Sequence, residues 1–205
     1  MPKIIDHEAR RKELARAAWR VIRRHGLEGA TVRNVAKEAG MSVGSLRHYF
    51  KSQSELLAFS MRLISERVEK RIFQLQEQGL TGDIRADVTR MLEEVLPLDE
   101  ERVSESIVWL GFVSRALVDP ALAPLSAEVH ESMLRFMRML AEALLALLPD
   151  RTGLDAELEA RRLQALLDGI VVHALGNPDS VTPETIRRIL AYHLDQMLQR
   201  PLGTR

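Results

Sequence analysis

Apolar residues recur at three- and four-residue spacing along the whole chain, and this periodicity is the feature that most constrains its fold. Such spacing places apolar side chains on one face of an α-helix, whereas a half-buried strand alternates apolar and polar residues. The sequence has no sustained alternation of that kind and no Asn-Gly hairpin signal. With 205 residues, the chain can form one large domain or two small ones. We therefore predict an all-α protein.

Capping residues, glycines and prolines divide the pattern into separate predicted helices. Thr31, Ser42, and either Ser52 or Ser54 are expected N-caps, and Gly26 is expected to end the first helix. The predicted helices cover residues 8–25, 31–39, 43–49, 52–78, 83–96, 101–118, 121–148, 155–175 and 183–198. Prolines break helices, and the sequence places such breaks at Pro97, Pro120, Pro149 and Pro178.

Charge is distributed unevenly, although the formal net charge is zero. Residues 1–51 hold 12 Lys plus Arg against 5 Asp plus Glu, a balance of +7, and the remainder holds 17 against 24, a balance of -7. A basic module on an acidic body indicates one end that faces a polyanion. Like charges also cluster by chance on solvated faces, so charge alone leaves both interpretations open.

Several function classes lack the residues that they need. The chain has no Cys, which excludes a disulfide framework, a Cys-ligated zinc site and a thiol nucleophile, and fits a reducing cytosol. No stretch resembles a signal peptide or approaches the roughly 20 apolar residues of a membrane span. A Gly-rich phosphate loop, a nucleophile elbow, a His-Glu metal motif and the Glu-x-x-His spacing of di-iron bundles are also absent. We expect a cytoplasmic protein that is not an enzyme, with no cofactor, metal or membrane partner.

The segment TVRNVAKEAGMSVGSLRHYF, residues 31–50, has the pattern of a helix-turn-helix. Ala36 permits close approach of a neighbouring helix, and Gly40 can adopt the left-handed conformation of a sharp turn. The residues expected to form the shared core are Val35, Ala39, Leu46 and Phe50.

The side chains that remain outside this core on the predicted helix 43–49 are mostly short or basic. They are Val43, Gly44, Ser45, Arg47, His48 and Tyr49, and Lys51 follows them. An α-helix fits the major groove of DNA, where Arg can donate two hydrogen bonds to guanine, while Ser, Tyr and Lys can contact phosphates. Any one of these residues alone is more often an ordinary surface or core residue. Together, in register with Ala36, Gly40 and Leu46, they favour DNA binding.

The run from Ala18 to Leu57, centred on GATVRNVAKEAGMSVGSLRHYFKSQSELL, resembles the DNA-binding domain of the TetR family of transcriptional repressors. This resemblance implies base contacts from Arg33, Val43, Gly44 and Arg47, and backbone contacts from Thr31, Ser45, Tyr49 and Lys51, with His48 as a further candidate. Two positions depart from the family pattern. Arg47 stands where the family usually has Tyr, and Gln53 stands where it usually has a phosphate-binding Lys, which would shift that contact to Lys51.

The later segments WLGFVSRALVDPAL and LQALLDGIVVHALGNPDSVTPETIRRILAYHL resemble the C-terminal domain of the BetI-type branch of that family. The implied organisation is an N-terminal three-helix helix-turn-helix domain, residues 1–53, joined to a larger helical domain for effector binding and dimerisation, residues 54–205. Double-stranded DNA and a small-molecule effector are the implied partners.

A homodimer is also expected on physical grounds. A recognition helix of two turns contacts only a few base pairs, whereas two copies at half-sites one helical turn apart bind a palindromic operator more tightly. We predict pairing through the last two helices, by a stripe that contains Leu166, Leu167, Ile170, Ala174, Ile186, Ile189, Leu190, His193, Leu194 and Met197. The same residues can instead face the core of their own subunit.

Eight residues are candidates for binding the effector: Trp109, Phe112, His130, Met133, Phe136, Met137, Asp168 and His173. Met and aromatic side chains at helical spacing are more often ordinary core. Asp168 and His173 lie in apolar stretches, where a buried charge needs a partner such as Arg115 or a ligand. Trp109 and Phe112 suit a flat or cationic molecule, and the long apolar helices favour an apolar or amphipathic one.

We therefore expect a homodimeric transcriptional repressor, released from its operator by a small molecule that shifts the fourth helix. An enzyme is the main alternative of another class. A third possibility is a helical DNA-binding or interaction protein without an effector, whose second domain would be fully packed.

Overall fold

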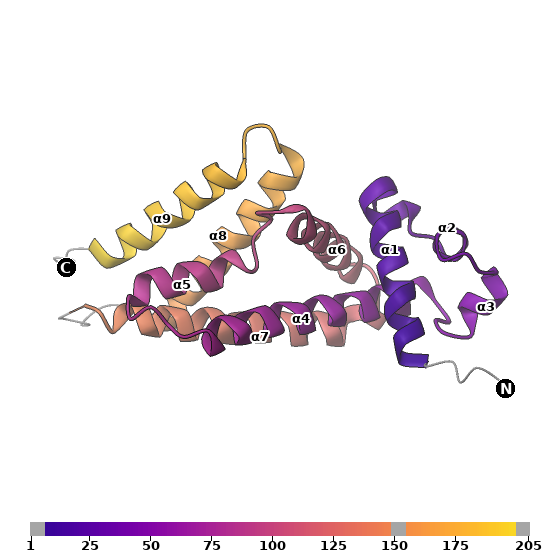
Figure 1. The fold of residues 1–205 in the computed structure, drawn as a ribbon, viewed down its shortest axis with the longest axis horizontal. Helices are drawn as coiled ribbons and strands as arrows, with labels where there is room; N and C mark the ends of the chain where they lie inside the picture. The colour runs from indigo at the N-terminus through magenta and orange to yellow at the C-terminus, as the bar shows by residue number, and fades with distance from the viewer. Residues whose placement is uncertain (1–6, 149–154, 200–205) are drawn as a thin grey trace. The chain divides into compact units, whose positions relative to one another are not determined.

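Every regular element that the structure describes is helical, which confirms the all-α prediction (Figure 1). The structure is a computed structural model, and it describes residues 7–148 and 155–199. Within these ranges the elements are α1 (His7–Gly29), α2 (Val32–Glu38), α3 (Val43–Arg47), α4 (Gln53–Glu77), α5 (Ile84–Glu93), α6 (Glu100–Ala116), a 3₁₀ turn η1 (Pro120–Leu122), α7 (Ala123–Leu145), α8 (Ala156–Gly176) and α9 (Pro183–Gln199).

The helix boundaries follow the local signals of the sequence. Thr31 and Ser42 cap α2 and α3 as predicted. Of the two candidate caps for α4, Ser52 accepts the N–H of Glu55 at 3.0 Å. The predicted helix 121–148 begins instead with η1, because the Asp119 carboxylate caps that turn by accepting the Ala121 N–H at 3.1 Å. Pro149, a predicted break, lies outside the described residues.

Gly26, predicted to end the first helix, instead interrupts α1. Its φ of 67° and ψ of -178° are not helical, and one further turn follows as far as Gly29. A residue with a side chain is strained at such a positive φ, so glycine is the natural residue for the break. The bend lets the chain turn from α1 into α2.

The described chain divides into two compact units. The N-terminal unit contains residues 7–67 and 104–126, and the C-terminal unit contains residues 68–103, 127–148 and 155–199. Most of α6 therefore belongs to the same compact unit as residues 31–50, although it is distant from them in sequence. These two units are defined by packing alone. The predicted boundary between the two functional domains, after residue 53, stays a prediction.

Apolar faces of α1, α2, α3 and α4 form the core of the N-terminal unit. The buried side chains include Leu14, Ala18, Val21, Ile22, Val35, Ala36, Leu46, Phe50, Leu56 and Leu57. Burial of each large aliphatic side chain contributes about 1.5 to 3 kcal/mol. Ala39 is only half-buried at the end of α2, so its predicted place in this core is wrong.

The C-terminal unit packs α5, α7, α8 and α9 around leucines and other aliphatic side chains, among them Val88, Leu92, Leu140, Leu144, Leu163, Ile170, Leu190 and Leu194. Ion pairs join the helices at the edges of this core. Arg85 on α5 pairs with Asp195 on α9 at 2.7 Å, and Arg187 on α9 pairs with Glu93 on α5 at 3.0 Å. In Figure 1 the chain reverses after α8, so that α9 runs back antiparallel to it.

Burial corrects the predicted pairing stripe on the last two helices. Leu167, Ile170, Ala174, Ile186, Leu190, Leu194 and Met197 all lie in the core of their own subunit, so their assignment to a pairing surface is wrong. The period of an apolar stripe identifies the buried face of a helix but does not say what covers it. The large apolar side chains that are exposed on these helices are Leu158, Val172, Ile189 and Tyr192.

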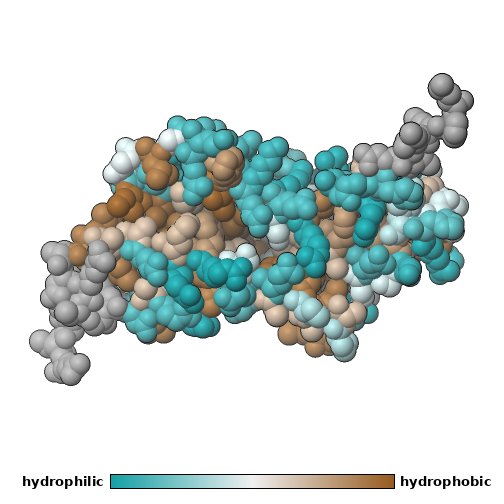
Figure 2. Space-filling view, turned by 90° about the horizontal axis from the view of Figure 1, so that it is seen from below, coloured by the Kyte–Doolittle hydropathy of each residue, from teal (hydrophilic) through white to brown (hydrophobic). Residues whose placement is uncertain are grey.

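Apolar residues also reach the surface elsewhere, and the face drawn in Figure 2 shows brown apolar patches among teal hydrophilic side chains. Leu117 and Val118 are the most exposed of them in the described chain, at 82% and 75%. Among the helices that the structure describes, none combines the length and hydrophobicity that crossing a membrane requires.

Candidate nucleic-acid interface

Two capped helices and one glycine turn build the motif at residues 31–50. The Thr31 hydroxyl accepts the N–H of Asn34 at 3.2 Å, and the Ser42 hydroxyl accepts the N–H of Ser45 at 3.1 Å. Between the helices, Gly40 adopts a φ of 64°, in the left-handed region. The chain therefore turns sharply from α2 into α3, which is the geometry of a helix-turn-helix.

The two sides of α3 differ in what they contact. Leu46 is fully buried and Phe50, just after α3, is 1% exposed, so these residues anchor it to the core. Arg47, His48 and Gly44 are exposed on the other side. Short and basic groups are therefore presented outward by a helix that is fixed from behind.

The remaining candidates lie around this face. Val43, Ser45 and Tyr49 are half-buried, and Thr31, Arg33 and Lys51 are exposed. The backbone N–H of Lys51 donates to the Glu55 carboxylate at 2.8 Å. Its ammonium group is therefore the part of Lys51 left to contact a phosphate.

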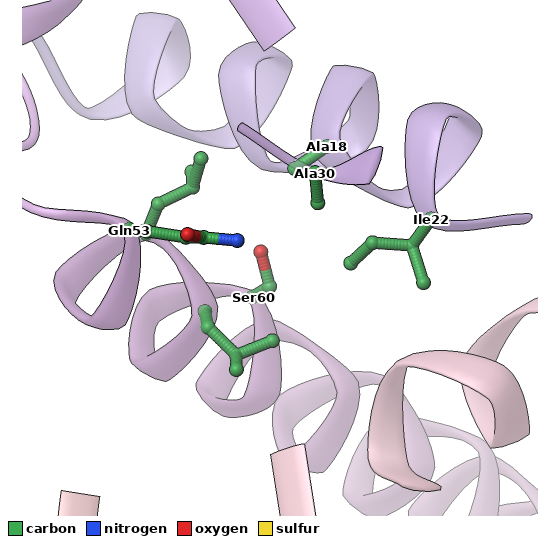
Figure 3. Close-up of a pocket in the computed structure, with 7 residues that line it drawn as sticks. Ala18, Ile22, Ala30, Gln53 and Ser60 are labelled. Carbon is green, nitrogen blue, oxygen red and sulfur yellow. The ribbon is translucent and has the colours of Figure 1, made fainter. Parts of the chain in front are cut away.

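Gln53 turns inward. Its side-chain amide points toward Ser60 in a small cavity between α1 and α4 (Figure 3). The cavity measures about 10 Å³ and is lined by Ala18, Ile22, Ala30, Gln53, Leu56, Leu57 and Ser60. A phosphate contact from this position would need a longer, outward-pointing side chain such as Lys.

An ion-pair clamp holds α1 to the end of α2. Glu38 accepts hydrogen bonds from Arg20, at 2.6 Å, and from Arg24. These hydrogen bonds, that of Arg20 first, lower the pKa of the Glu38 carboxyl. The clamp offsets the single acidic charge of α2, which leaves the motif basic overall.

Comparison with known proteins decides the family. Residues 14–59 match the model for bacterial regulatory proteins of the tetR family, and residues 84–199 match the model for the C-terminal domain of BetI-type transcriptional repressors. The chain belongs to the TetR family of transcriptional regulators. It is a DNA-binding transcriptional regulator and not an enzyme, as the sequence predicted.

Relatives match nearly the full length of this TetR-family chain. It is 41% identical to the HTH-type transcriptional regulator PksA of Bacillus subtilis, with 96% of this chain and 94% of the relative covered. It is 30% identical to the HTH-type transcriptional regulator BetI of Vibrio parahaemolyticus, with 97% and 96% covered.

Solved structures show the same TetR-family fold. A transcriptional regulator from Rhodococcus sp. Rha1 matches with a TM-score of 0.80 and 30% identity, covering 92% of this chain and 96% of that one. A regulator from Saccharomonospora viridis, solved in complex with choline, matches with a TM-score of 0.78 and 23% identity, covering 97% and 100%.

The effector candidates fall in different surroundings. Trp109 and Phe112 belong to the N-terminal unit, and the other six belong to the C-terminal unit. Phe112 and Met137 are core residues, at 1% and 0% exposed. Trp109, Met133 and Phe136 are half-buried.

His130 and Asp168 are brought close to each other in the C-terminal unit. Gln164 on α8 contacts His130 Nδ1 on α7 at 3.2 Å, and Asp168 lies one turn further along α8. Burial raises the pKa of the Asp168 carboxyl, and the nearby His130 opposes this shift. Two other expectations, that His173 is buried and that Arg115 pairs with Asp168 or His173, are not confirmed. His173 is exposed rather than buried, and Arg115 pairs with Asp119 at 3.4 Å.

Proposed function

We propose that this regulator is a homodimeric repressor that binds a palindromic operator through α3 of each subunit and leaves it when a small molecule binds. The main observation that supports this proposal is that α3 has a buried side, which contains Leu46, and an exposed side, which contains Arg47. A helix with that division can enter the major groove without losing its core contacts.

The contacts with DNA follow from the chemistry of the exposed groups. Arg47 and Arg33 donate to base edges, and the small Val43 and Gly44 allow the helix to approach the groove closely. Phosphates are held by the Thr31 and Ser45 hydroxyls, by Tyr49 and by the Lys51 ammonium group, with His48 beside them. Gln53 takes no part, since its amide faces the cavity.

The subunits pair through the exposed faces of α8 and α9. Leu158 and Val172 on α8 and Ile189 and Tyr192 on α9 are between 37% and 69% exposed. Large apolar side chains on two adjacent antiparallel helices are suited to a four-helix bundle with a second copy. Pairing of this kind sets the spacing of the two recognition helices.

The effector binds in the C-terminal unit beside His130 and Asp168. Asp168 is a half-buried carboxylate that lies near the His130 imidazole, and such a carboxylate favours a molecule that carries a positive charge. Half-buried Met133 and Phe136 on α7 add apolar surface. The effector is therefore amphipathic, and choline, which the Saccharomonospora viridis regulator binds, is a suitable first compound to test.

Selection of bound fragments from random duplex DNA tests the proposal. The expected product is a palindrome with half-sites one helical turn apart, bound by one dimer. Recovery of fragments without a common sequence, or no binding at low ionic strength, would contradict it.

Titration of small molecules against the selected complex tests release. Choline and an amphipathic cation with a longer apolar chain are compared at constant ionic strength, because salt alone weakens DNA binding. Release by either compound, lost in Asp168→Asn, supports the effector site. The fully buried Met137 favours the alternative of an effector-free DNA-binding protein, and release by no compound would support that alternative.

A further inference from the structure

Arg11 occupies an unusual place for an arginine in the first helix. Its guanidinium carbon lies 4.9 Å from the centre of the Phe50 ring and 4.4 Å from that of Phe59. Its Nε is buried and has no hydrogen-bond partner in the described structure. An apolar side chain would fill this space without leaving a polar group unpaired. An arginine is therefore not needed to fill this space, and the contacts that its guanidinium makes are the feature to explain.

The contacts of Arg11 lead to the turn between α3 and α4. Arg11 Nη2 lies 3.8 Å from the Glu55 carboxylate, and the same carboxylate accepts the backbone N–H of Lys51 at 2.8 Å. Phe50, against which Arg11 packs, directly precedes Lys51. Arg11 is thus linked to the turn in two ways, by its contact with the Phe50 ring and by its ion pair with the Glu55 carboxylate.

A second residue of α1 supports the same turn. The His7 ring lies 5.4 Å from the Tyr49 ring. His7 and Arg11 are four residues apart and therefore lie on one face of the helix. This face of α1 contacts the consecutive residues Tyr49 and Phe50, so its first two turns support the end of the recognition motif.

We propose that Arg11 is a positioning residue of the DNA interface, which fixes the α3–α4 turn so that Tyr49 and Lys51 face the phosphate backbone. The proposal rests on the proposed DNA contacts of those two residues. Arg11 itself does not touch DNA. Its planar cation, in contact with two rings and a carboxylate, sets an orientation that a flexible lysine would not.

A double-mutant cycle on the selected operator tests this role. Dissociation constants are measured by fluorescence anisotropy at one salt concentration for the full-length protein, Arg11→Met, Lys51→Ala and the double variant. Arg11→Met is expected to weaken binding about tenfold alone and by less than about threefold in the Lys51→Ala background, because one of the two residues that it positions is gone. Independent effects that multiply in the double variant would overturn the proposal.

Arg16→Met is the matched control. Arg16 is exposed on the same helix, so this variant removes the same charge without touching the turn. Its effect should be the same factor with and without Lys51→Ala. Coupling as large as that of Arg11→Met would show a general effect of charge and would overturn the positioning role.

Two further variants keep the test decisive if Arg11→Met folds poorly. Arg11→Lys retains the charge and should still lose affinity, whereas full binding by this variant would show that charge alone matters. Glu55→Ala removes the acceptor of the Lys51 N–H, and its side chain is 40% exposed, so the core is spared. Its effect on the dissociation constant should also be smaller in the Lys51→Ala background. Fold-changes of Glu55→Ala and Lys51→Ala that simply multiply in the double variant would count against the proposal. If the unmodified protein binds no duplex, the proposed function fails instead.

Discussion

The Ser54 hydroxyl donates a hydrogen bond to the carboxylate of Asp119, which ties the first turn of α4 to the segment between α6 and α7. These residues are 65 positions apart in sequence and belong to the same compact unit. Asp119 also accepts the Ala121 N–H and lies 3.4 Å from Arg115. One carboxylate therefore joins the start of the helix that follows the DNA-binding motif to a segment of the later sequence.

Replacing Ser54 by Ala should lower the thermal midpoint of the protein. The change leaves the half-buried Asp119 carboxylate without its hydroxyl donor, and a hydrogen bond to a charged group is among the stronger ones. Ser65→Ala, at a half-buried position on the same helix, is the matched control and should change the midpoint less. Equal midpoints for the two variants, measured by circular dichroism, would argue against the bond.

Acid should remove the contribution of Asp119 to stability. The hydrogen bond from Ser54, and after it that from the Ala121 backbone, lower the pKa of Asp119 below its ordinary value of 3.8. A lowered folded-state pKa gives a contribution that is complete above the unfolded pKa and disappears as pH falls through the folded one. The difference in unfolding free energy between the natural protein and Asp119→Asn should stay constant above about pH 5 and shrink toward about pH 3. If this difference in unfolding free energy instead grew as the pH fell, the pKa of Asp119 would not be lowered in the folded protein.

Gly40→Ala should destabilise the protein by about 1 to 2 kcal/mol, because Gly40 holds a φ of 64° that a residue with a side chain adopts only with strain. Apart from Gly40 itself and its two chain neighbours, no atom lies within 4 Å of the added methyl group, so the cost is conformational rather than steric. Gly44→Ala is the control, since Gly44 lies in α3 without a positive φ and should tolerate the change or gain stability. Urea unfolding measures both, and equal free energies for the two variants would contradict the prediction.

Tyr192→Glu should convert the proposed dimer into a monomer without unfolding it. Tyr192 is 69% exposed in the single chain, so a charge there costs little until a second copy covers it. Leu117→Glu places the same charge at an apolar residue that is 82% exposed in the other unit, and this control should remain dimeric. Analytical ultracentrifugation distinguishes the two species. A dimeric Tyr192→Glu would place the pairing surface elsewhere.

Local signals predicted the DNA-binding motif well. Thr31 and Ser42 cap their helices and Gly40 turns left-handed, because each of these features depends on residues within four positions of it. The predicted core positions of Val35, Leu46 and Phe50 are confirmed, whereas the prediction for Ala39 is wrong, because Ala39 lies where α2 ends and is partly open to solvent.

Long-range relationships were not predictable from the same signals. Ser54 was considered only as a helix cap, since nothing near it in sequence indicates Asp119 as a partner. Arg11 resembled any charged residue of an amphipathic helix, and only the structure shows that it packs over the rings of Phe50 and Phe59. Val172 and Tyr192 are exposed but were not part of the predicted pairing stripe, because that prediction followed the regular apolar stripes of α8 and α9, which mostly face inward.

The most direct test of the central claim, that the exposed side of α3 contacts base edges, is the affinity of Arg47→Ala for the selected operator and for every single-base variant of it. Loss of a bidentate contact predicts a cost of about 1 to 3 kcal/mol on the operator and loss of preference at one base pair of each half-site. Unchanged preference at every base pair would contradict the claim.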